Sequence, residues 1–181
     1  MLPGMDLAKA IASDEFPAQV RKKPALAKAS DEHGVSALLL ALYHHRPDAR
    51  DALIAAGAPI GPLEAAALGD VDRLKEADLS VRGGDGFTPL HLAAFFGGAP
   101  AVRAILARGA DPDADANNTF GVRPIHSATA VGDYESVSAL LEAGADPNVT
   151  QQGGYTPLDA ARRNENTQIE QLLLEHGAVN R

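Results

Sequence analysis

The sequence predicts an all-α solenoid of about six helix-turn-helix units with finger loops, one unit being shortened near residues 61–84. Three observations support this fold. Segments that begin a predicted helix recur 35 and 33 residues apart, at Pro89, Pro124 and Pro157. Each predicted helix is short and carries one apolar stripe, so a single unit cannot enclose a core. Alanine dominates the apolar residues and aromatic residues are only 4%, which favours closely stacked helices.

The clearest unit covers residues 85–118 and carries a start or stop signal at every junction. Asp85-Gly86 has the composition of a turn, and Thr88-Pro89 is typical of the N-cap and first position of a helix. Gly97-Gly98 is expected to end this first helix, because glycine disfavours helix interiors. The residues that repeat at helical spacing, and that we expect in the core, are Leu90, Ala93 and Ala94, followed in the second helix by Val102, Ile105 and Leu106.

This unit has copies in register along the chain. Its segments Thr88 to His91 and Gly109-Ala110 correspond to Arg123 to His126 and Gly144-Ala145, and then to Thr156 to Asp159 and Gly177-Ala178. The chain therefore resembles the ankyrin repeat, a unit of about 33 residues with a turn, two helices and the signature T-P-L-H-x-A. The match is clear over residues 85–181 and weaker before them.

The resemblance implies one ankyrin-repeat domain over residues 1–181. It divides into an N-terminal capping unit (1–32), four repeats (33–60, 61–84, 85–118 and 119–152) and a C-terminal capping repeat (153–181). Helix pairs are expected at 5–22, 37–56, 62–77, 89–108, 124–143 and 157–176, with minimal strand. Pro62 and Pro89 are only 27 residues apart. The missing residues come from the second helix of this unit or from the finger after it, and we expect a shortened second helix with a local change in curvature.

The charge of the chain narrows the class of partner. The formal net charge is −8, from 16 Lys and Arg and 24 Asp and Glu. Residues 1–60 hold seven of each sign, so residues 61–181 hold nine basic and seventeen acidic residues. Phosphate backbones and anionic lipids repel such a surface, which excludes nucleic acid and membranes as expected partners and favours a neutral or basic protein. Without cysteine, a recognisable leader or a long apolar stretch, we expect a cytoplasmic protein, and we expect it to be a monomer.

The histidines of the repeat signature are interpreted as structural. The resemblance implies that the Thr and His of T-P-L-H hydrogen-bond within and between units, a pair that Thr88 and His91 match. No Ser, Cys or carboxylate is placed to form a catalytic triad with His91 or His126. Where Arg123 replaces Thr and Asp159 replaces His, we expect a weaker network.

No pattern in the chain predicts a metal or a cofactor. The adjacent pair His44-His45 lacks the i, i+4 spacing of helical metal ligands. The segment Asp111 to Asp115 lacks the central glycine and the final glutamate of a calcium loop. Phosphate-binding glycine motifs are absent as well, so we expect neither a nucleotide nor any other cofactor.

Aromatic residues mark the candidate partner surface. The resemblance implies that partners bind the inner surface, formed by the finger tips and the C-terminal ends of the first helices. Four of the five Phe and two of the three Tyr residues fall at such positions. Apolar rings on a concave surface favour protein binding. The residues expected to bind a partner are Tyr43, His44, Phe87, Phe95, Phe96, Phe120, Val122, Tyr155, Arg162 and Arg163, the two arginines by contacting carboxylates.

Two other functions remain open from the sequence. The aromatic patch could meet itself in a homodimer. A small enzyme could place its site in the irregular region 61–84, although its carboxylates there, such as Glu64 and Asp70, lack a partnered His or Ser. The aromatic residues also have a structural interpretation, because Phe87 and Tyr155 could cover finger backbones and Phe96 could fill a gap beside the shortened unit.

Overall fold

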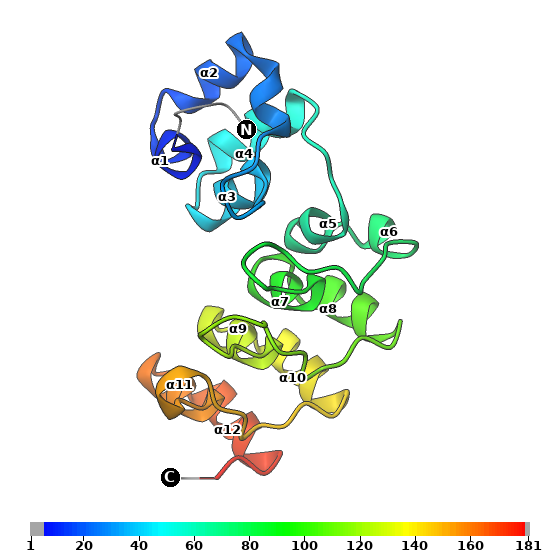
Figure 1. The fold of residues 1–181 in the computed structure, drawn as a ribbon. Coiled ribbons are helices and arrows are strands. Elements are labelled where there is room, and N and C mark those ends of the chain that lie inside the picture. The colour runs from blue at the N-terminus through cyan, green and yellow to red at the C-terminus, as the bar shows by residue number, and fades with distance from the viewer. Residues whose placement is uncertain (1–5, 180–181) are drawn as a thin grey trace.

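The computed structural model describes residues 6–179 and confirms an all-α solenoid of helix pairs, with no strand in that range. Figure 1 shows the pairs stacked in chain order, from α1 and α2 at one end to α11 and α12 at the other. The first helices of the units are α3 (Ala37–Tyr43), α5 (Pro62–Leu68), α7 (Pro89–Leu92), α9 (Pro124–Val131) and α11 (Pro157–Arg163). The second helices are α4 (Pro47–Ala55), α6 (Val71–Leu74), α8 (Ala99–Leu106), α10 (Tyr134–Glu142) and α12 (Thr167–Glu175).

The N-terminal end consists of α1 (Leu7–Ala12), α2 (Phe16–Lys22) and the 3₁₀ helix η1 (Pro24–Lys28). Residue 5, where the predicted pair begins, lies outside the described residues. Pro24 separates α2 from η1, because it lacks the N–H that would continue the helix. The guanidinium of Arg46 donates to the carbonyl oxygens of Ile11 and Ala12, at 3.3 and 2.5 Å. This contact fastens α1 to the start of α4.

Local signals in the sequence set where the helices begin. Proline occupies the first turn of α4, α5, α7, α8, α9 and α11, where its missing N–H removes no intrahelical bond. Polar side chains cap other helices by accepting a backbone N–H: Ser36 from Leu39 at 3.2 Å, Asp133 from Ser136 at 3.2 Å and Asn166 from Ile169 at 3.1 Å. These starts agree with the predicted register.

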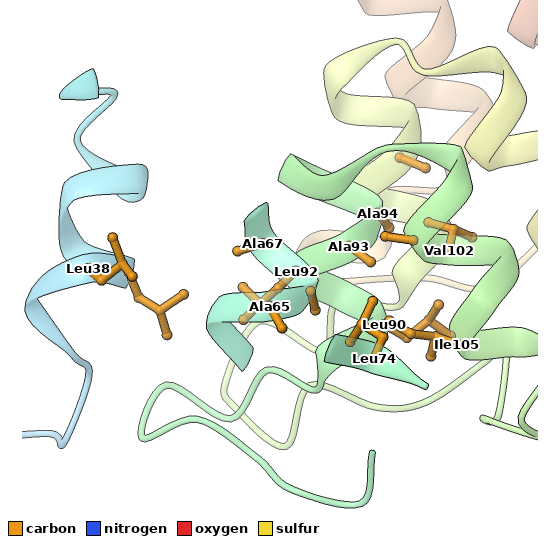
Figure 2. Close-up of a cluster of buried hydrophobic side chains, with 14 of the residues drawn as sticks. Leu38, Ala65, Ala67, Leu74, Leu90, Leu92, Ala93, Ala94, Val102 and Ile105 are labelled. Atoms are coloured by element: carbon orange, nitrogen blue, oxygen red, sulfur yellow. The ribbon is translucent and has the colours of Figure 1, made fainter. Parts of the chain in front are cut away.

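The core lies between neighbouring units. Leu74, Leu90 and Ile105 are at most 1% exposed and gather from α6, α7 and α8 (Figure 2). Small side chains let α5 and the following first helix approach closely. A Cβ atom added at Gly97 would lie 2.1 Å from the carbonyl oxygen of Ala66. Glycine is therefore required at residue 97 by the packing of one backbone on another.

The shortened unit is confirmed in its second helix. Helix α6 has four residues and ends at Leu74, whereas α10 and α12 have nine residues each. The guanidinium of Arg108, from the loop after α8, donates to the carbonyl oxygens of Leu74 and Ala77 at 2.6 and 2.7 Å. The next unit thus supplies partners for carbonyl groups that a longer helix would satisfy internally. The predicted change in curvature stays a prediction.

A finger is also missing before α5, which the sequence analysis did not foresee. Only residues 56–61 connect α4 to α5, whereas residues 75–88 and 107–123 connect the next pairs. The fingers that are present are closed by backbone hydrogen bonds from Asp31 to Val35, Gly83 to Phe87, Ala116 to Val122 and Gln151 to Tyr155, the last enclosing the 3₁₀ turn η3 (Gln152–Gly154). The spacing of 25 residues between Ala37 and Pro62 was the signal that could have revealed the deletion.

The first helix of unit 85–118 ends differently from its counterparts. Elsewhere a residue with positive φ ends the first helix, namely His45 (51°), Gly69 (70°), Gly132 (74°) or Glu165 (54°). Here α7 continues into the π-helical turn η2 (Ala93–Gly97), and the chain reverses one position later at Gly98. Gly98 has φ 76° and ψ 174°, a conformation that essentially only glycine adopts. Phe95 and Phe96 lie on this turn.

Candidate partner-binding surface

The structure brings part of the predicted surface together in one apolar pocket. The pocket has a volume of about 190 Å³ and lies where the end of α3 faces the finger and first helix of unit 85–118. Its lining residues are Tyr43, His45, Phe87, His91, Leu92, Phe95, Phe96 and Ser127. The four aromatic side chains are half-buried, while His91, Leu92 and Ser127 are buried. Four of the ten predicted binding residues therefore share one cavity.

The aromatic rings of the pocket contact one another. The ring centroids of Phe95 and Phe96 are 4.6 Å apart, and those of Tyr43 and Phe96 are 5.7 Å apart, with the planes tilted by 59° and 30°. The His45 ring lies 6.4 Å from Phe96. Such tilted arrangements are favourable for aromatic pairs and hold the rings in fixed positions.

The missing finger explains why this pocket exists. Tyr43 and Phe96 belong to units 33–60 and 85–118, which are separated in the chain by the whole of unit 61–84. Because there is no finger before α5, the finger that precedes α7 packs directly on the finger that precedes α3. A Cβ atom at Gly84 would lie 1.6 Å from the carbonyl oxygen of His33. Tyr43 thereby reaches across the shortened unit.

A hydrogen bond fixes this contact across the shortened unit. The Tyr43 hydroxyl donates to Asp85 Oδ2 at 2.5 Å. Burial raises the pKa of Tyr43, and the bond to Asp85 raises it further, so the phenol stays protonated and remains a donor. Tyr43 was among the predicted binding residues, but the sequence showed no sign that it binds Asp85.

The histidine network of the repeat signature is confirmed. His91 is 1% exposed, and its Nδ1 lies 2.8 Å from the Thr88 hydroxyl and accepts the Thr88 N–H at 3.3 Å. Its Nε2 lies 3.0 Å from the carbonyl oxygen of Val122 in the next unit. An Nδ1 that accepts implies that the proton sits on Nε2 and is donated to Val122. Burial lowers the pKa of His91 to about 4, so the ring is neutral near neutral pH.

A weaker hydrogen-bond network was expected where Arg123 and Asp159 depart from the signature, and this expectation is correct at only one of the two positions. At Arg123 the hydroxyl donor is lost, and His126 Nδ1 accepts the backbone N–H of Arg123 alone at 3.0 Å, while the guanidinium pairs with Asp115 at 2.7 Å. The expectation is wrong within the last unit. Asp159 accepts from both the N–H and the hydroxyl of Thr156 at 2.9 and 2.8 Å, because a carboxylate at this position completes a capping box.

The sequence analysis missed the corresponding role of Glu64. This residue occupies the histidine position of the shortened unit, where its Oε2 accepts the N–H of Gly61 at 3.0 Å. Its Oε1 accepts the hydroxyl proton of Ser36 in the preceding unit at 2.7 Å. One carboxylate thus makes the bonds within and between units that Thr88 and His91 share elsewhere. Alignment of Pro62 with Pro89 was the available signal.

The remaining predicted binding residues lie outside the pocket. Phe120 and Tyr155 are 57% and 50% exposed, and the Arg163 guanidinium lies 5.2 Å from the centre of the Tyr155 ring. Arg162 pairs with Glu170 at 2.7 Å, which engages one of the two arginines within the chain. His44 is exposed at the C-cap of α3. Val122 is half-buried, and its carbonyl oxygen accepts the hydrogen bond from His91.

The carboxylates of the region 61–84 have local partners. Asp70 caps α6 and pairs with Arg73, Asp72 pairs with Lys75 at 2.7 Å, and Asp78 accepts from Ser80. Within residues 6–179 no group of three His, Cys, Asp or Glu side chains is arranged to hold a metal ion. No helix in the same range is long and apolar enough to cross a bilayer.

Stacked helix pairs, projecting fingers and a Thr–His network between units define a helical repeat protein. A family profile described as ankyrin repeats (3 copies) matches residues 63–151 and 112–181. The B-cell lymphoma 3 protein homolog of Mus musculus is 33% identical over 150 residues, which cover 83% of this chain and 22% of that protein. The chain belongs to the ankyrin-repeat family. Ankyrin repeats are generally protein–protein interaction modules.

Proposed function

We propose that this protein is a non-catalytic module that binds a partner protein through its inner surface, with the aromatic pocket as the main contact. The observation that carries the proposal is the clustering of half-buried rings from Tyr43, Phe87, Phe95 and Phe96 around an open cavity. The fully buried contacts between units consist mainly of alanine and leucine, while Tyr43, Phe87 and Phe96 pack against this core and keep part of each ring exposed. Aromatic residues in such pockets are enriched among binding hot spots.

The repeat stack supplies the mechanism. The ring contacts and the Tyr43–Asp85 hydrogen bond hold the pocket in place before a partner arrives. A surface that is ordered beforehand loses little conformational entropy on docking. The exposed Phe120 and the Tyr155–Arg163 pair extend the same proposed surface towards the C-terminal end. A cytoplasmic location, with partners among the proteins there, is part of this proposal.

The test replaces the pocket rings and measures binding. The double substitution Phe95→Ala and Phe96→Ala should weaken partner binding by about 2 kcal/mol or more, as for paired hot-spot residues. Proteins captured from a lysate of the native host by the unaltered chain would be identified, and each affinity would then be measured directly with both chains. Circular dichroism would establish that the variant is folded. Unchanged affinity in a folded variant would refute the proposal.

Self-association through the same rings is the competing outcome. Light scattering on the purified chain distinguishes it, because a homodimer that buries the aromatic pocket doubles the mass and is lost with the same double substitution. A monomer at all concentrations leaves the pocket available to a different protein.

A further inference from the structure

Three carboxylates lie close to Tyr43, one of the residues that line the aromatic pocket, and none of them forms an ion pair within residues 6–179. Asp31, Glu64 and Asp85 come from three consecutive stretches of the finger side, and all three are half-buried. Their carboxylates all raise the pKa of the pocket residue Tyr43, which places Tyr43 in their negative field. The hydrogen bonds that they accept come from neutral groups. Asp31 accepts the backbone N–H groups of His33 and Val35. Glu64 accepts the Ser36 hydroxyl and the Gly61 N–H, and Asp85 accepts the Tyr43 hydroxyl and the Phe87 N–H.

The cations on the other side of the pocket are already paired. Behind Phe96, a second cavity of about 350 Å³ is lined in part by Arg46 and Arg50. Arg46 pairs with Asp48 at 2.7 Å and with Asp14 at 3.3 Å, and Arg50 pairs with Asp51 at 2.8 Å. No ion pair involves Asp31, Glu64 or Asp85 anywhere in residues 6–179. Arg82 is also near Asp85, but its guanidinium donates to the carbonyl oxygens of Gly86 and Asp115, so the three carboxylates are available to a cation from outside the chain.

We propose that the pocket accepts a lysine or arginine side chain from a basic segment of the partner, with its aliphatic stem against Phe95 and Phe96 and its charged head at the Asp85 carboxylate. This inference rests on the proposed function and names the chemistry of the partner. Such side chains bury an apolar stem while the charge stays near polar groups. The head also gains from the faces of aromatic rings.

The size and charge of the site agree with this occupant. A pocket of about 190 Å³ accommodates one long side chain and excludes a folded element of the partner. An acidic partner segment would meet three half-buried carboxylates, and bringing like charges together weakens binding. The excess of acidic residues in 61–181 extends the attraction for a basic segment beyond the pocket itself.

The test uses random peptides displayed on phage, selected on the full chain in low-salt buffer and then synthesised with a fluorescent label. Peptides that bind the unaltered chain but not Phe96→Ala define the pocket binders. We expect these binders to contain lysine or arginine. Their affinity, measured by fluorescence anisotropy, should fall about tenfold in Asp85→Asn and also at high salt. Asp85→Asn leaves the size of the side chain unchanged; its one oxygen can accept the Phe87 N–H while its amide group donates to the Tyr43 oxygen.

A matched control removes the same charge elsewhere. Glu175 is exposed on α12, where it accepts from Gln171 at 2.9 Å, so Glu175→Gln should leave peptide affinity unchanged. Pocket binders without lysine or arginine, or with equal affinity for Asp85→Asn, would overturn the inference while the proposed function stands. If no selected peptide depends on Phe96 in a folded variant, the pocket is not the docking site and both proposals fail.

Discussion

Acidification should lower the free energy of unfolding of the solenoid, because His91 is buried and its pKa is therefore lowered. The pKa of a free histidine side chain is about 6.5, and burial lowers the pKa of His91 to about 4. Because one pKa unit corresponds to about 1.4 kcal/mol, the gap between the two values corresponds to about 3 kcal/mol. The side chain is 1% exposed, so solvent screens little of this effect.

The direction follows from which state binds the proton. Between pH 6.5 and about 4 the unfolded chain protonates this histidine and the folded chain does not, so the free energy of unfolding falls as pH falls. The contribution is complete above pH 6.5 and lost by about pH 4. The main cause is burial, which penalises the charged ring, and a protonated Nδ1 could also no longer accept the Thr88 N–H.

The assay is urea unfolding followed by circular dichroism at a series of pH values, on the unaltered chain and on His91→Gln. Glutamine at this helix position can still accept the Thr88 N–H but does not titrate. The difference in unfolding free energy between the two chains should shrink by about 3 kcal/mol from pH 6.5 to 4. His126, whose pKa is also lowered by burial, is present in both chains and cancels. A difference that does not change with pH would refute this reasoning.

Three further predictions concern stability and are measured by the same unfolding experiment at neutral pH. Gly97→Ala should cost about 3 kcal/mol, because its Cβ atom would lie 2.1 Å from a backbone oxygen of Ala66; a loss below 1 kcal/mol would contradict the packing. Arg108→Ala should cost about 2 kcal/mol by leaving the carbonyl groups at the end of α6 without a charged donor, and an unchanged midpoint would count against that cap. Asp113→Asn should add about 1 kcal/mol to the free energy of unfolding at neutral pH. Burial raises the pKa of Asp113, so its ionised form costs stability as pH rises above 3.8. An asparagine suits this position, because its counterpart in the next unit, Asn148, both donates to and accepts from backbone groups. The gain should vanish at low pH, and a gain independent of pH would exclude this cause.

Much of the fold was predictable because the repeat signature combines several local signals. A proline in the first turn, a capping residue before it and a glycine after the second helix each favour the same boundary. The hydrogen bonds of Thr88 and His91 were predicted correctly, because these two residues belong to one repeat signature and the other acceptor of His91 lies in the adjacent unit. The second helix of unit 61–84 was expected to be short from the distance between Pro62 and Pro89. The missing finger before α5 was overlooked because the earlier unit lacks the signature proline at Ala37.

The candidate site was less predictable, because it depends on which units touch. The sequence indicated that Tyr43, Phe95 and Phe96 lie on one side of the stack. Their gathering into one pocket required Tyr43 to reach across unit 61–84, and the pairing of Arg162 with Glu170 required the relative orientation of α11 and α12. The π-helical turn that carries both phenylalanines is not encoded by any pattern in residues 93–97 that we can identify.

The sequence by itself determined the repeat, its register, the helix starts and the residues that face the core, because these depend on turn chemistry and on periodicity within about 33 residues of chain. The tertiary structure alone decided how the units meet around the deletion. It placed Asp85 on the Tyr43 hydroxyl, Glu64 between Ser36 and Gly61, and Arg108 on the end of α6. These bonds join residues from different units, and their geometry is set by the stacking of backbones rather than by any local preference.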